Sequence, residues 1–146
     1  MIATTGLDER PRDPDLGGPV PFACEYDDGR ASVSLLNPKR VTQCALSRIC
    51  GVCGASLGRP VAFLGSVAES DREEFHFPPV HVECAEAVLA ACAGATVGVL
   101  GQDEPVSSWV LVTTGGFEHE RPQADALDRR PTFRPNSVIA TRTLPA

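Results

Sequence analysis

Two short pieces of this 146-residue chain carry metal-binding side chains, and their spacing constrains the fold more than any other feature. The first is Cys50-Gly-Val-Cys53, and after 27 further residues come His81 and Cys84, three positions apart. A Cys-x2-Cys turn lets two thiolates face one ion, and residues three apart at a helix start share a face. Zinc prefers four tetrahedral ligands drawn from thiolate and imidazole. The pattern therefore predicts a single, closed Cys3His zinc site.

Two other interpretations of the four residues stay open. A redox-active Cys-x-x-Cys dithiol is expected at the start of a helix that follows a strand, as in thioredoxin-like folds. Here the pair is followed by Gly54, Gly58 and Pro60, which indicate turns. Ordinary buried thiols would leave the coincidence of four candidate ligands unexplained. Zinc is the favoured interpretation, and Gly54 supplies the backbone freedom that the first turn needs.

Two helices are predicted on either side of this pattern. Asn37 is a suitable N-cap and Pro38 a suitable first residue for a helix that leads to Cys50. A second helix is expected over residues 82–93, because acidic side chains lie in its first turn and Gly94 follows its end.

Strands are expected at residues 61–64, 75–77, 107–114 and 136–144, where apolar and β-branched residues gather. The first two are expected to form a hairpin, because the segment between them is polar and Pro78-Pro79 prevents the second from continuing. Residues 115–135 are expected to be a long loop.

The chain is expected to form one domain of the α+β class. Residues 1–20 are rich in Pro, Gly and Asp and are predicted to be disordered, which leaves a zinc-binding domain at 21–146. Its zinc-binding core covers about 48–94, and C-terminal strands cover about 107–143. Aromatic residues make up only 5% of the chain, so the core is modest and a structural metal would help it fold.

The order of knuckle, hairpin and a helix carrying the last two ligands resembles the treble-clef zinc finger over residues 48–94. The stretches CGVCGASLGRPVAF and PPVHVECA also resemble short treble-clef proteins of actinobacteria and their phages, over about residues 22–94. This resemblance implies a zinc-binding fold and no particular activity.

Catalysis at the metal is not favoured by the sequence. His81-Val82-Glu83 contains the His-x-Glu of zinc nucleobase deaminases, but there the cysteine pair follows on a second helix, whereas here it comes first. Cys84 also fills the position that an activated water needs. His-Asn-His nucleases share the expected frame, with a catalytic histidine on the hairpin, where only His76 is available. The alternative function is therefore a small hydrolase, nuclease or deaminase-like zinc enzyme that uses His76 or Glu83.

Three cysteines and one histidine lie outside the pattern. Cys92 is two helical turns beyond Cys84, about 12 Å along the helix, and so cannot reach the same ion. Cys24 and Cys44 lie among apolar residues and, like Cys92, are expected to be core thiols. His119 sits among charged residues in the expected loop, where it is predicted to be solvated.

Charge favours a protein partner over nucleic acid. The net charge is −6, whereas nucleic-acid binders are normally basic. Residues 31–68 nevertheless hold four bases and no acid, namely Lys39, Arg40, Arg48 and Arg59. This basic face near the knuckle is predicted to contact another protein, with scattered solvated arginines as the alternative.

No secretory signal and no run of 18 apolar residues is visible, which favours a cytoplasmic protein without membrane contact. In that reducing compartment, six cysteines indicate metal binding or buried thiols rather than disulfides. The sequence thus predicts an interaction module stabilised by structural zinc.

Overall fold

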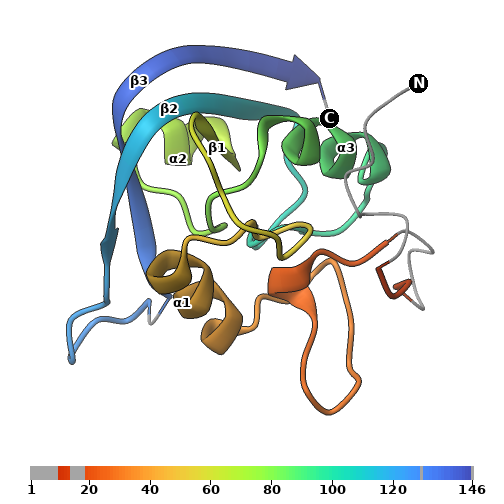
Figure 1. Ribbon diagram of the computed structural model, residues 1–146. Helices are drawn as coiled ribbons and strands as arrows, with labels where there is room; N and C mark the ends of the chain where they lie inside the picture. The colour runs from red at the N-terminus through yellow and green to blue at the C-terminus, as the bar shows by residue number, and fades with distance from the viewer. Residues whose placement is uncertain (1–9, 14–18, 129, 146) are drawn as a thin grey trace.

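The computed structural model describes residues 10–13, 19–128 and 130–145, and it has the α+β class that the sequence predicts. The elements are the 3-10 turn η2 (Phe22–Cys24), α1 (Pro38–Ser47), β1 (Val61–Gly65), α2 (Val67–Arg72), α3 (Val82–Ala91), β2 (Ser108–Glu120) and β3 (Thr132–Pro145). The three strands form one antiparallel sheet in the order β1-β2-β3. In Figure 1, β2 and β3 run as a long curved ribbon, with α2 and α3 beneath it and α1 on the opposite side of β1.

The helix that leads to the knuckle begins as predicted. The Asn37 side chain accepts a hydrogen bond from the Lys39 backbone N–H at 3.0 Å, and Pro38 is the first helical residue. The helix ends at Ser47 because Arg48 adopts a left-handed conformation with φ 52°. That reversal turns the chain directly toward Cys50.

The prediction of a hairpin between residues 61–64 and 75–77 is wrong. β1 instead pairs with β2, from Val61 opposite Thr114 to Gly65 opposite Val110. The segment after β1 forms α2, because Ser66 and Glu69 make a capping box in which each side chain bonds the other residue's backbone N–H. This Ser-x-x-Glu spacing is a helix signal that was present in the sequence.

Residues 115–135 are not the long loop that was expected. β2 continues to Glu120 and β3 begins at Thr132, so the connection covers only residues 121–131. The strands extend because Phe117 and Phe133 pack with Phe63 in one aromatic cluster, with centroid separations of 5.5–5.9 Å. The paired strands near 107–114 and 136–144 are confirmed, with a register shift at Thr113 and Thr114.

The predicted disorder of residues 1–20 falls largely on positions 1–9 and 14–18, which lie outside the described residues. In the described part, Asp13 is buried and accepts a hydrogen bond from the Val33 N–H at 2.7 Å. Arg10 forms an ion pair with Glu25, and Val20 is buried in the core. These short pieces are therefore packed against the domain.

Glu69 provides a test of how the loops around α2 are held. Its buried carboxylate accepts hydrogen bonds from Ser66 N and His76 N, each at 3.1 Å, and from the Gln102 side chain. Glu69→Ala leaves three donors without this acceptor, so we expect a loss of about 2–4 kcal/mol in the free energy of unfolding. Urea denaturation measures it. Asp71→Ala, at an exposed position of the same helix, is the control and should change stability by less than about 0.5 kcal/mol. Equal effects of the two substitutions would contradict this account.

Candidate metal centre

The structure brings both ligand pieces together. One ligand atom from each of four residues lies within 4.8 Å of the other three. The first two residues lie in the turn after α1, and the other two lie at the N-cap and in the first turn of α3. The four residues are Cys50, Cys53, His81 and Cys84.

The first turn is built by backbone hydrogen bonds. Gly54 N donates to Cys50 O at 2.9 Å, and Gly54 has φ +78°, a conformation that side chains rarely adopt. The Val52 and Cys53 N–H groups point at Cys50 Sγ, at 3.3 and 3.5 Å. This arrangement favours a thiolate at Cys50, because backbone N–H groups stabilise negative charge on sulfur.

Backbone contacts also fix the second piece against the first. Gly51 N donates to Pro79 O at 2.9 Å, and His81 N lies 3.4 Å from Cys50 Sγ. Val80 and Ala62 exchange two hydrogen bonds, at 2.8 and 3.0 Å, which anchors the residue before His81 to β1. The start of α3 is therefore held against the knuckle by the main chain.

The orientation of His81 identifies its ligand atom. Nε2 lies 2.9 Å from the Ser56 carbonyl oxygen, which can only accept, so Nε2 carries the hydrogen and donates it. Nδ1 then presents its lone pair to the sulfurs of Cys53 and Cys84, at 3.5 and 3.6 Å. Metal-bound histidines in proteins are typically oriented in this way by an acceptor on the other ring nitrogen.

The three thiols differ in how readily they ionise. A hydrogen bond from the Cys84 thiol, together with the nearby backbone N–H groups, lowers the pKa of Cys50. The same contact with Cys50, together with burial, raises the pKa of Cys84, and burial raises that of Cys53. Crowded sulfurs oppose further ionisation of one another, whereas a coordinated divalent cation deprotonates all of them. The cluster is therefore suited to a cation.

The donor atoms of the cluster are of the kind that zinc prefers. Three sulfurs and one imidazole nitrogen fit zinc, whereas magnesium and calcium require oxygen ligands. Four protein ligands also complete a tetrahedron. Within the described part of the chain, this is the one group of Cys, His, Asp and Glu side chains close enough together to share an ion.

The remaining cysteines lie in the core, outside the cluster. Cys24, Cys44 and Cys92 are all buried free thiols. Burial raises the pKa of Cys44 to about 12 and that of Cys92 to about 11, and it raises the pKa of Cys24 as well. Such thiols are poor metal ligands and poor nucleophiles at neutral pH.

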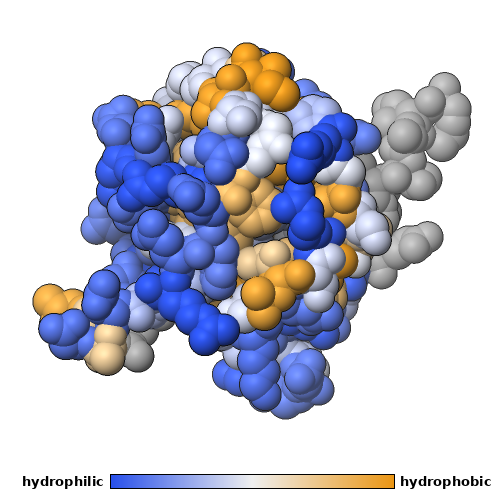
Figure 2. Space-filling view, turned by 60° about the vertical axis from the view of Figure 1, so that its left-hand side comes forward, coloured by the Kyte–Doolittle hydropathy of each residue, from blue (hydrophilic) through white to orange (hydrophobic). Residues whose placement is uncertain are grey.

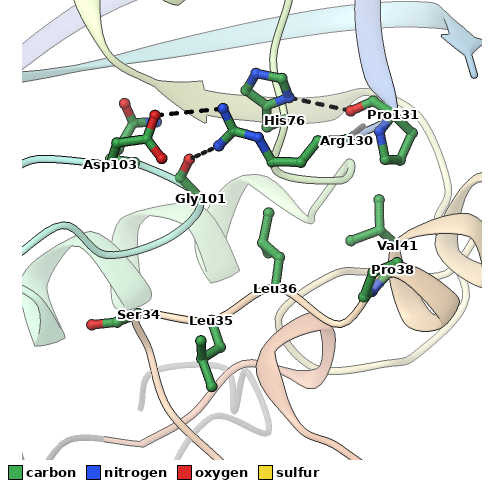
Figure 3. A pocket seen from close by; sticks show the side chains of 11 residues that line it. Ser34, Leu35, Leu36, Pro38, Val41, His76, Gly101, Asp103, Arg130 and Pro131 are labelled. Atoms are coloured by element: carbon green, nitrogen blue, oxygen red, sulfur yellow. Dashed lines mark hydrogen bonds and ion pairs between the residues drawn. The ribbon is translucent and has the colours of Figure 1, made fainter. Parts of the chain in front are cut away.

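His76 does not lie in a hairpin strand, because residues 75–77 form no strand. Its side chain is buried, with Nδ1 3.3 Å from Pro131 O and Nε2 3.6 Å from Asp128 Oδ2. It lines a cavity (Figure 3), and none of the four metal-ligand candidates is among the residues that line it. Glu83 is exposed in the first turn of α3.

The prediction that His119 is solvated in a loop is wrong. His119 lies in β2, where its ring packs on Phe133 with centroids 5.1 Å apart. Its Nε2 atom is buried and has no hydrogen-bond partner among the described residues, and burial lowers the pKa of the ring. His119 is covered in this way because β2 and β3 extend further than predicted, which places His119 opposite Phe133.

The four basic residues near the knuckle are not equivalent. Arg40 stacks on Phe22 at 4.4 Å and forms ion pairs with Glu25 and Asp27, at 3.4 and 3.6 Å. Arg48 lies over the Phe117 ring at 5.1 Å. Lys39, Arg48 and Arg59 are exposed and have no ion pair to a described carboxylate.

No protein-family model, no curated protein and no solved structure matches this chain. Among its described residues, no helix combines the length and the apolar character needed to cross a lipid bilayer.

Metal content separates ligands from core thiols. We expect one ion per purified chain, and Cys53→Ala is expected to lose most of it because the sulfur is one of four donors. Cys24→Ala is the matched control, since that thiol is buried outside the cluster, and it should keep full content. Elemental analysis measures both, and cobalt substitution adds the thiolate-to-metal absorption bands of a tetrahedral site. Full metal content in Cys53→Ala would rule out this ligand set.

Proposed function

We propose that the protein is an interaction module whose fold is stabilised by one structural zinc ion. The observation that carries the proposal is the closed donor set of three cysteines and one histidine, in which His81 is oriented by the Ser56 carbonyl. The metal would join the turn after α1 to the start of α3. In small zinc fingers such an ion contributes about 10–16 kcal/mol of apparent binding free energy, which is also folding free energy.

We further propose that the site has the treble-clef arrangement. Three features support it: the Cys50–Cys53 turn, the antiparallel bridge between Ala62 and Val80, and α3, which has His81 as its N-cap and carries Cys84. The chain forms one bridge here rather than a full second strand, because Pro78 and Pro79 precede Val80 and cannot donate ladder hydrogen bonds.

A structural role is favoured over a catalytic one by the coordination and by His76. Four protein ligands leave no position for substrate or an activated water. Both ring nitrogens of His76 face acceptors of its own chain, so neither is directed at a zinc-bound group. Six free cysteines support a reducing, cytoplasmic location, which remains part of the proposal.

The partner proposed is a protein that presents acidic side chains to the basic face near the knuckle. Arg48 and Arg59 form the centre of this face, because Leu57 N donates to Arg48 O at 2.9 Å and places Arg59 two residues away. Lys39 lies at the far end of α1, and Arg40 contributes less because Glu25 and Asp27 already neutralise it. Two central arginines on a chain of net charge −6 favour a protein surface over a nucleic-acid backbone.

Chelation tests the structural role of the metal. Removing zinc with a strong chelator is expected to unfold or loosen the region that includes the knuckle and α3, because the ligands then lose their common ion. Circular dichroism and amide hydrogen exchange measure the change, and added zinc should reverse it. A metal-free protein with unchanged exchange protection in α3 would contradict a structural ion.

Charge reversal tests the proposed face. Arg48→Glu and Arg59→Glu are each expected to abolish or strongly reduce capture of the partner from a host lysate, since like charges then meet across the interface. Arg72→Glu, an exposed residue of α2 with the same change in charge, is the matched control. Identical captured material with all three variants would exclude this face. If treating the lysate with nuclease abolishes the capture, the partner is a nucleic acid and not a protein.

A further inference from the structure

A cavity of about 290 Å³ lies between the segment before α1 and the Gly101–Asp103 loop (Figure 3). Leu36, Pro38 and Val41 line one side, and His76, Arg130 and Pro131 line the other. Ser34, Gly101 and Asp103 also line the cavity.

The polar groups around this cavity already have partners within the chain. Arg130 donates to both oxygens of Asp128, at 3.0 and 2.8 Å, and to Gly101 O at 2.8 Å. Both nitrogens of His76 also face acceptors. Leu35, Leu36, Pro38 and Val41 make one wall apolar, and the volume lies at the lower end for small-molecule sites, with room for an apolar side chain. These properties suit a single apolar side chain.

The same chain carries an exposed apolar side chain on a projecting loop. The connection between β2 and β3, residues 121–128 with 130 and 131, projects from the body at the lower left of Figure 1, and we call it the arm. Leu127 on the arm has a relative exposure of 103%, the highest among the large hydrophobic residues described. Figure 2 shows hydrophobic atoms at the end of this projection.

We propose that two copies of the chain exchange arms, so that Leu127 of each copy enters the cavity of the other. The base of the arm, Arg130 and Pro131, is itself a wall of the cavity. Leu127 is four residues from Pro131, so its backbone lies within about 13 Å of that wall of the cavity. A two-fold axis between the copies can therefore form both contacts at once, as a self-complementary interface requires.

Charged residues on the arm and at the rim of the cavity are compatible with this exchange. Arg121 at the start of the arm has no ion pair to a described carboxylate. At the rim of the cavity, the side chain of Asp103 is 86% exposed and reaches Arg130 only at 3.6 Å. Arg121 of one copy can thus pair with Asp103 of the other, which gives the contact an orientation.

The exchange is tested by sedimentation of the full metal-loaded chain from micromolar to millimolar concentration. We expect a reversible dimer whose dissociation constant rises at least tenfold in Leu127→Ser, because each dimer loses two buried leucines. Leu127 is fully exposed, so the substitution leaves the monomer fold intact. Leu46→Ser, at a leucine that is 69% exposed on α1, is the matched control and should dimerise like the parent chain.

An isotope-filtered nuclear Overhauser experiment on mixed labelled and unlabelled chains locates the contact. We expect intermolecular signals between the methyl groups of Leu127 and those of Leu36 or Val41. A monomer at all concentrations overturns the proposal. So does a dimer that Leu127→Ser leaves unchanged, or the absence of intermolecular signals between Leu127 and the residues of the cavity.

Discussion

The main-chain contact between the knuckle and the start of α3 is the constraint on which the metal centre depends. Gly51 donates to the Pro79 carbonyl, Val80 pairs with Ala62, and His81 follows immediately. Cys50 and His81 are 31 residues apart in sequence. Closing such a loop has an entropic cost. The main-chain hydrogen bonds and the burial of β1 offset this cost without any contribution from the ligand side chains. The donor atoms are thus brought together by the fold, and a metal ion would lock this arrangement.

An aromatic cluster and a buried polar network lie next to each other in the core. The chain contains few aromatic residues, and Phe63, Phe75, Phe117 and Phe133 form one cluster. Beside it, the Glu69 carboxylate and the Phe75 ring both lie against Gly65, and hydrogen bonds satisfy the polar groups around Glu69, His76 and Arg130. This network shapes a cavity with an apolar interior, and it withdraws His76 from any role at the metal. The candidate metal centre and this cavity therefore share no lining residue.

Local sequence rules predicted the elements whose signals are short-range. The α1 start follows from Asn37 and Pro38, and α3 begins at Val82 with Glu83 in its first turn, as the acidic residues there predicted. The grouping of Cys50, Cys53, His81 and Cys84 followed from their spacing, since each pair is brought to one face by a single turn. Likewise, the separation of Cys92 from the site followed from helix rise alone. The capping box at Ser66 and Glu69 was equally local and was overlooked.

What the sequence by itself determined is therefore the grouping of the four candidate ligands, the α+β class and the helices that flank the site. Only the tertiary structure decided that β1 pairs with β2 rather than with residues 75–77, and that His119 packs on Phe133. It also decided that Arg40 is neutralised by Glu25 and Asp27, and that the Ser56 carbonyl orients His81. The physical reason is range. Caps, turns and ligand pairs depend on residues three or four apart, whereas strand partners, ion pairs and cavities depend on contacts between distant segments that no local pattern encodes.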